Sequence, residues 1–208
     1  FDRSGISGAS FTLSTSLATD SQYYWRVYAE NICGSVISAQ VFSFRTSPGA
    51  AACGDGTVKQ VIYFEDFESG LDGWNNSGDP LKFDLTTVKA YSPLTSVAAS
   101  VPATIADQRL VSPAISVPNT TEPVSLIFWH RWSFDSTTSC NDGAILEATT
   151  NGGTTWNQVA KSYLLTNAYN STVKSGVYNP LSGKNAWCFE TKEWVRTVVQ
   201  LSPFKGQT

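Results

Sequence analysis

Residues 124–135 read VSLIFWHRWSFD, and the alternation in this stretch determines the fold class that the sequence predicts. Apolar side chains and the chain's only histidine fall on one face, at Val124, Leu126, Phe128, His130, Trp132 and Phe134. The other face holds Ser125, Ile127, Trp129, Arg131, Ser133 and Asp135. A period of two residues is typical of a β-strand that buries one face. The stretch therefore predicts a long strand in an all-β core, with His130 turned toward that core.

The composition is typical of an all-β protein that works outside the cell. Of the 208 residues, 41% are hydrophobic and 15% are charged, against about 25% charged in an average globular chain. The formal net charge of −3 gives no field that would attract nucleic acid. No apolar segment approaches the roughly 20 residues that a membrane span requires. We therefore expect neither a nucleic-acid partner nor membrane insertion.

Turn-forming residues divide the chain into two expected all-β units. Strands are expected at 11–15, 23–31 and 41–46 in the first unit, residues 1–47. The segment 48–57 is rich in Pro, Gly and Ala, as domain linkers are. In the second unit, residues 58–208, strands are expected at 61–67, 96–101, 108–111, 124–135, 144–149, 156–162 and 195–201.

The first unit carries a recognisable strand pattern. Leu17 precedes an alternating run of Tyr23, Trp25, Val27 and Ala29, and the run FSFRT follows at 42–46. This pattern resembles the last strands of a fibronectin type III domain. The resemblance implies a tyrosine corner formed by Leu17 and Tyr23. Because a sandwich of this type has about seven strands in ~100 residues, we expect a truncated domain that lacks its opening strands.

The second unit carries an ordered set of motifs. These are FEDFESG at 64–70, GW at 73–74, LVSP at 110–113, LIFWHR at 126–131, DGAILE at 142–147, NGGTTW at 151–156, NPLSG at 179–183 and Trp187. Together they resemble the MAM-like jelly-roll module found behind the catalytic domains of secreted bacterial peptidases, including the immune inhibitor A metallopeptidases. The resemblance implies a jelly-roll β-sandwich, and we expect this one to lack its last strands.

The four cysteines predict disulfides rather than a metal site. Cys33, Cys53, Cys140 and Cys188 allow three pairings, and none has the CxxC spacing of a zinc or thioredoxin-type site. Pairing Cys33 with Cys53 and Cys140 with Cys188 keeps each bridge within one expected unit; free buried thiols are the alternative. Because disulfides persist in oxidising compartments, the expected location is secreted or at the cell surface.

Four acidic residues are candidates for a calcium site. Glu65, Asp66, Glu68 and Asp142 lie at expected strand ends or turns, and Ca²⁺ takes about 6–8 oxygen ligands of this kind. The jelly-roll modules that the chain resembles often hold a structural calcium near the first strand, which implies one here. The alternative is that these carboxylates are solvated turn residues.

The residues give no pattern that predicts catalysis. A zinc peptidase commonly carries HExxH and an α/β-hydrolase GxSxG; neither motif occurs, and His130 is the only histidine. We expect His130 to be a hydrogen-bonded core residue. The run TTNGGTTW at 149–156 resembles an Asp-box hairpin, with Asn151 in the place of the usual aspartate. We expect its side chain to close the turn and Trp156 to anchor the next strand in the core.

Exposed aromatic side chains are the remaining candidates for a functional site. Trp129 is expected on the outer face of its strand, and other aromatics lie in or beside loops, at Trp74, Tyr91, Tyr163, Tyr169, Tyr178 and Trp187. Trp129, Trp74 and Trp187 are the expected surface-binding residues.

The sequence thus predicts a non-catalytic accessory or adhesion module of a secreted or cell-surface bacterial multidomain protein. Its partner would be an extracellular protein or polysaccharide surface. Alternatives are a fragment of a secreted metallopeptidase, or other extracellular peptidase, whose catalytic domain lies outside this chain, and a carbohydrate-binding module. Because truncated sandwiches expose unpaired strand edges, we also expect neighbouring copies, or chain beyond these residues, to complete both sheets.

Overall fold

A computed structural model describes residues 5–6, 8, 10–13, 15–19, 21–38, 40–46, 49–53, 56–91, 93–100, 104–134, 137–176 and 178–208. In these residues the regular structure is β-strand, apart from two 3₁₀ turns, η1 (Lys161–Tyr163) and η2 (Ser202–Phe204), which confirms the predicted all-β class. The chain divides into unit 1, Phe1–Lys59, and unit 2, Gln60–Thr208, two residues beyond the end of the expected linker. The described part contains no helix long and apolar enough to span a membrane.

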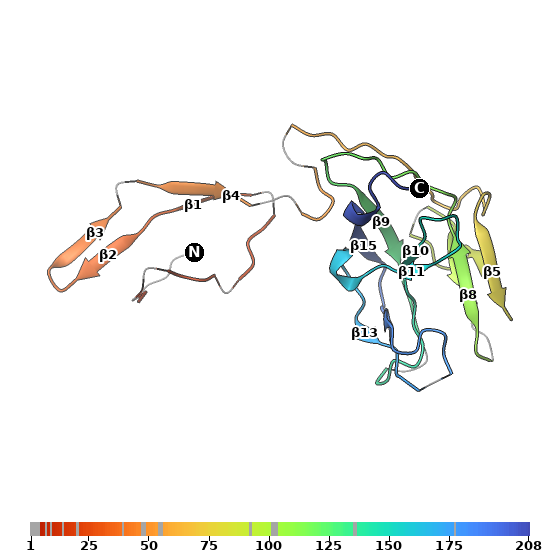
Figure 1. Ribbon diagram of the computed structural model, residues 1–208. Helices are drawn as coiled ribbons and strands as arrows, with labels where there is room; N and C mark the ends of the chain where they lie inside the picture. Colours follow the sequence, from red (N-terminus) through yellow and green to blue (C-terminus); the bar gives the residue numbers. More distant parts are fainter. Residues whose placement is uncertain are drawn as a thin grey trace. The chain divides into compact units, whose positions relative to one another are not determined.

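Unit 1 contains an antiparallel ribbon (Figure 1). The strand β1 (Gln22–Trp25) pairs with β4 (Phe42–Arg45), and β2 (Tyr28–Asn31) pairs with β3 (Gly34–Ile37). The single strand expected at 23–31 is interrupted at Arg26 and Val27. Ala18 donates its backbone N–H to the Tyr23 hydroxyl at 2.9 Å.

One face of this ribbon carries a ladder of aromatic side chains. Tyr23 stacks on Phe44 with ring centroids 5.7 Å apart, and Trp25 stacks on Phe42 at 4.7 Å. Such cross-strand pairs stabilise antiparallel strands. Trp25 nevertheless keeps 48% of its surface exposed and Phe44 keeps 44%. No second layer covers the ladder among the described residues of unit 1.

The central sheet of unit 2 has three antiparallel strands. The strands β12 (Leu164–Thr166) and β9 (Ser125–His130) flank β15 (Val195–Gln200). The register between β9 and β15 runs from His130 opposite Val195 to Ser125 opposite Gln200. The predicted alternation of β9 is present, but regular pairing ends at His130, after which Ser133 makes one isolated bridge to Glu190.

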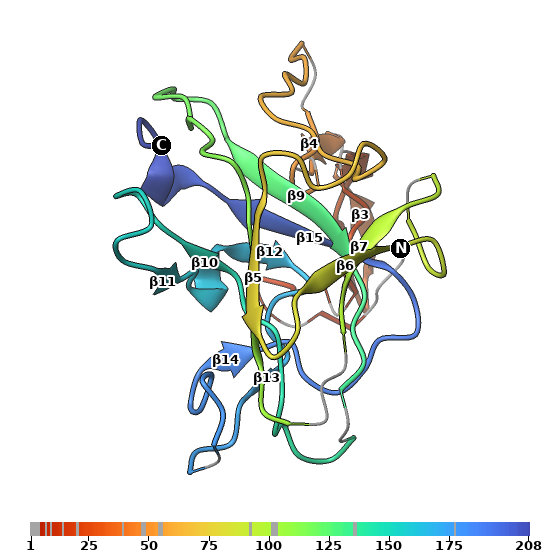
Figure 2. The same cartoon turned by 90° about the vertical axis from the view of Figure 1, so that its right-hand side faces the viewer.

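Among the described residues of unit 2, four two-stranded ladders accompany this sheet. Figure 2 shows them around it. They pair β5 (Asn75–Asp79) with β8 (Asp107–Val111), β6 (Phe83–Thr86) with β7 (Ser96–Ala99), β10 (Glu147–Ala148) with β11 (Asn157–Gln158), and β13 (Ser171–Thr172) with β14 (Asn185–Ala186). The strand expected at 61–67 does not form, and those expected at 144–149 and 156–162 are reduced to two residues each.

The hydrophobic core lies against the inner face of the central sheet. Its buried members are Val159, Leu164, Tyr169, Trp187 and Val199, and Leu126 and Phe128 pack on them from β9. The Tyr169 hydroxyl donates to the Leu146 carbonyl and accepts from the Leu146 N–H, both at 3.2 Å. This buried tyrosine therefore satisfies its own polar atom while filling the core.

The hairpin between β10 and β11 closes in the predicted way. The Asn151 side-chain oxygen accepts the Thr155 N–H at 3.0 Å, and Gly152 and Gly153 have φ of 67° and 85°. Trp156 differs from the prediction: it is only partly buried and lies outside the core clusters.

The cysteines pair in only one of the two predicted bridges. Cys140 and Cys188 form a disulfide that is packed against Val173 and Ala186. Cys33 and Cys53 are free and exposed, so the predicted bridge between them is wrong.

The reason is the reach of the chain. Cys33 lies at the tip of the β2–β3 hairpin, about 30 Å of strand beyond Gln22. Gly49 lies beside Thr19 at the opposite end, and the four residues from Gly49 to Cys53 span at most about 14 Å.

Candidate functional site

Trp129 occupies the outer face of the central sheet, as predicted. It lies near the end of β9, opposite Arg196 of β15, and 38% of its surface is exposed. Tyr91 stacks on it with ring centroids 3.9 Å apart and an interplanar angle of 13°. Trp194 approaches Tyr91 at 6.3 Å and 59°. We call Tyr91, Trp129 and Trp194 the aromatic platform.

Sequence reasoning named the platform only in part. Tyr91 comes from the loop between β6 and β7, which Figure 2 shows beside the end of β9. A contact between residues so far apart in sequence has no local signal. Trp194, in contrast, had a local signal, because it directly precedes a predicted strand. Residues two apart in a strand share a face, so Trp194 is expected on the same face as Arg196, which lies opposite Trp129.

A carboxylate fixes the loop that carries Tyr91. Glu68 accepts the backbone N–H groups of Leu94 at 3.0 Å and Thr95 at 2.7 Å, and the Thr95 hydroxyl at 3.2 Å. Ser96 closes the same loop by donating to the Lys89 carbonyl at 2.6 Å. The N–H groups of Leu94 and Thr95 hold the pKa of Glu68 below its usual value. These hydrogen bonds restrain the loop that carries Tyr91.

Trp74 belongs to a neighbouring polar contact rather than to an open surface. Its indole N–H donates to Glu65 at 3.0 Å, and its ring lies 5.2 Å from that of Phe67. Burial raises the pKa of Glu65, but the hydrogen bonds from Phe67 and Trp74 outweigh that effect and the net pKa is lowered. Trp74 is partly buried, so it presents little surface to a partner.

Trp187 is a core residue, and its prediction as a surface-binding residue is wrong. Only 3% of its surface is exposed. Its ring meets those of Tyr169 at 4.7 Å and His130 at 4.6 Å, and its N–H donates to the Asn167 carbonyl at 2.8 Å. The sequence placed it beside a loop, but the bridge between Ala144 and Trp187 carries it into the core.

His130 lies in the core as predicted. Its ring contacts Phe128, Trp132 and Trp187, and its Nε2 pairs with the Thr197 hydroxyl at 2.8 Å. Burial lowers the pKa of His130 to about 4. At neutral pH the ring is therefore uncharged and packs as an aromatic side chain.

The four predicted calcium ligands do not gather into one cluster. Asp66 accepts the Glu68 N–H at 3.1 Å, and Asp142 accepts from the Asn179 amide at 3.2 Å. Glu65 and Glu68 also accept N–H donors, as described above. Within the described ranges, no group of three or more Asp, Glu, His or Cys side chains is arranged to hold a metal ion.

Comparison of the chain with family models, with curated proteins and with solved structures finds no match. The aromatic platform and its geometry are therefore the basis for a functional proposal.

Proposed function

We propose that this chain is a non-catalytic accessory module of a secreted or cell-surface protein, and that the aromatic platform binds an extracellular polysaccharide or protein surface. The observation that carries the proposal is the stacked pair of Tyr91 and Trp129. Its rings are partly exposed, at 50% and 38%, and the loop of Tyr91 is fixed by Glu68.

A pre-positioned aromatic pair suits a binding surface for physical reasons. Tyr and Trp offer large apolar faces and lose little conformational freedom on binding, which is why they are enriched at interfaces. Because Tyr91 covers Trp129, a ligand would contact the outward face of Tyr91 and the exposed edge of Trp129. The Cys140–Cys188 disulfide favours an extracellular setting, since such bonds persist in oxidising compartments.

Retention on insoluble polysaccharides and on immobilised extracellular proteins tests this proposal. Cellulose, chitin and peptidoglycan supply the first class, and collagen and fibrinogen the second. Removing one stacking partner, by Tyr91→Ala or Trp129→Ala, should weaken retention about three- to tenfold. Tyr178→Ala is the matched control, because Tyr178 is 91% exposed and lies outside the platform. Equal retention of Trp129→Ala and Tyr178→Ala would overturn the proposal.

An extracellular peptidase as the parent protein would use the same surface to position its substrate. The mass of the native polypeptide distinguishes the two parents. A polypeptide with no room for a catalytic domain would exclude the peptidase.

The ribbon of unit 1 supports the proposal that a neighbouring chain contributes a strand to it. An isolated two-stranded ribbon is marginally stable in water, and this one exposes Trp25, Phe42 and Phe44. Sedimentation at increasing concentration would show self-association, which Trp25→Ser should reduce. A monomer at every concentration would exclude pairing between copies of this chain.

A further inference from the structure

A pocket of about 240 Å³ lies in unit 2, apart from the aromatic platform. The β10–β11 hairpin forms one wall, and the turns η1 and η2 complete it. Val159, Tyr163 and Phe204 are apolar lining residues of the pocket, and Thr150, Asn157 and Gln207 are polar ones. The Gln207 side-chain amide also donates to the Pro203 carbonyl at 3.4 Å. Val159 and Phe204 pack in the core with Leu126 and Phe128, the inner-face residues of β9. The pocket therefore lies on the opposite side of the central sheet from Trp129.

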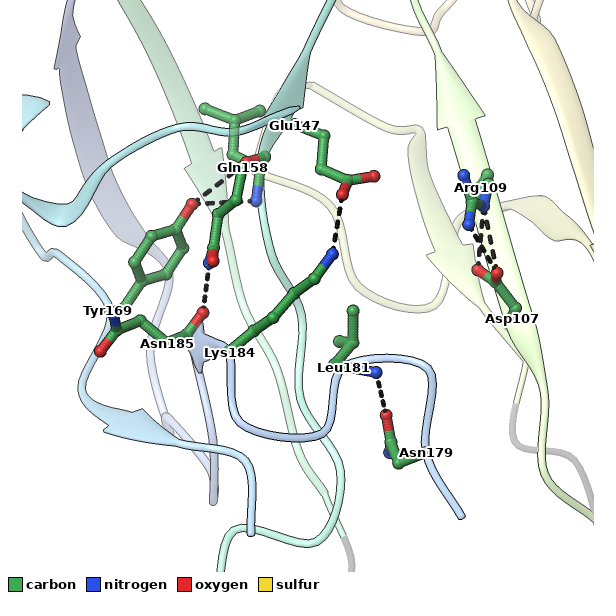
Figure 3. A network of polar contacts seen from close by, with 10 residues as sticks. Asp107, Arg109, Glu147, Gln158, Tyr169, Asn179, Leu181, Lys184 and Asn185 are labelled. Carbon is green, nitrogen blue, oxygen red and sulfur yellow. Dashed lines mark hydrogen bonds and ion pairs between the residues drawn. The ribbon is translucent and has the colours of Figure 1, made fainter. Parts of the chain in front are cut away.

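The walls of this pocket are fixed by the fold. Val159 donates its N–H to the Leu146 carbonyl at 2.9 Å, and Gly206 donates to the Val117 carbonyl at 2.8 Å. Gln158 is also a lining residue, and its side-chain amide donates to the Asn185 carbonyl (Figure 3). Figure 3 also shows the ion pair of Lys184 with Glu147, 3.1 Å apart, which ties the same hairpin to the chain before β14. A ligand would meet a preformed site.

The lining selects an uncharged ligand with both polar and apolar faces. Among the described residues, no Asp, Glu, Lys or Arg lines the pocket. Amide and hydroxyl side chains both donate and accept hydrogen bonds, as do the hydroxyl groups of a sugar. The rings of Tyr163 and Phe204 offer apolar surface to the C–H face of such a ring. At about 240 Å³ the pocket is smaller than the sites of drug-sized ligands, about 300–1,000 Å³.

We propose that this pocket binds a single neutral sugar ring, with Asn157, Gln207 and Thr150 bonding its hydroxyl groups and Tyr163 and Phe204 contacting its apolar face. This site is independent of the proposed function, since it lies on the other side of the sheet from the platform.

Titration of the ¹⁵N-labelled chain with free sugars tests the pocket directly. The probes are glucose, galactose, mannose and N-acetylglucosamine, with glucuronate as a charged comparison. The expected result is that at least one neutral sugar shifts the backbone amide signals of Asn157, Gln158 and Gln207, and that glucuronate shifts them less. The absence of shifts with all four neutral sugars at 50 mM would overturn the proposal.

Variants separate the pocket from the platform. Asn157→Ala and Gln207→Ala remove exposed side chains and should weaken binding about three- to tenfold, whereas Ala160→Phe should fill the pocket and abolish binding. Asn75→Ala, an exposed asparagine on β5, is the matched control and should bind normally. Trp129→Ala should also leave the shifts intact. Loss of the shifts in Trp129→Ala, or their persistence in both Asn157→Ala and Ala160→Phe, would show that the sugar binds elsewhere.

Discussion

Acidification should destabilise this protein through His130 before its carboxylates protonate. The neutral ring is packed among Phe128, Trp132 and Trp187, and burial holds its pKa at about 4, against about 6.5 in an unfolded chain. Between these two values the unfolded chain binds the proton and the folded chain does not. The contribution of neutral His130 to the free energy of unfolding is therefore fully present above pH 6.5 and is lost as the pH falls toward 4.

The magnitude follows from the two pKa values. Linkage, discounted for the partial exposure of the ring to solvent, gives a loss of about 2 kcal/mol between pH 7 and pH 4.5. Urea unfolding followed by tryptophan fluorescence at pH 7, 5.5 and 4.5 measures the loss. His130→Gln does not titrate but can still bond the Thr197 hydroxyl, so it is the comparison variant.

Subtracting the two profiles removes the contribution of the carboxylates. The wild-type chain should lose about 2 kcal/mol more than His130→Gln over this range. Parallel pH profiles for the two proteins would refute the reasoning, because they would show that the folded state accepts the proton as easily as the unfolded state does.

Four further outcomes are expected. Replacing both Cys140 and Cys188 by Ala opens a loop with a sequence separation of 48 and should lower the free energy of unfolding by about 4 kcal/mol in guanidinium; a loss below 1 kcal/mol would contradict this. Glu68→Gln should reduce the near-ultraviolet circular dichroism of the Tyr91–Trp129 stack. In the wild-type chain this signal should persist above pH ~4.3 and fall as the pH drops through the lowered pKa of Glu68. A signal that does not change with pH would argue against anchoring of the loop by Glu68. A thiol reagent should titrate two cysteines in the native protein and one in Cys33→Ser. If the native protein contained no reactive thiol, the result would support the predicted disulfide between Cys33 and Cys53. Because Glu65 and Glu68 already accept N–H donors, EDTA should leave the melting temperature unchanged, and a fall reversed by Ca²⁺ would support the predicted calcium site.

The strands with strong alternation were predictable, and the polar ones were not. Leu126, Phe128 and His130 occupy the inner face that their spacing predicted, and β15 lies within the strand expected at 195–201. The strand β5 reads NNSGD, a composition that favours turns. It exists because its backbone pairs with β8 and because Asn76 bonds the backbone of Phe83 through both side-chain atoms. Tertiary contacts of this kind override local propensity.

The candidate site shows the same limit. The alternation of the strand predicted that Trp129 points outward. It could not predict the contact with Tyr91, which comes from a distant loop anchored by Glu68. Trp187 was misplaced because its neighbours indicate a loop, whereas its burial comes from partners distant in sequence. The Cys33–Cys53 pairing failed because proximity in sequence was taken for proximity in space, and an extended ribbon separates the two residues.

The pairing of β9 with β15 also has a consequence for synthesis. His130 and Val195 are partners although they lie 65 residues apart, so β9 has no partner on that edge until β15 has left the ribosome. Closing so long a loop is entropically costly and slows folding. During this interval the apolar edge of β9 is open to aggregation. We therefore expect a nascent chain that stops before Val195 to depend on chaperones, and a chain that includes β15 to be released from them once β15 has docked.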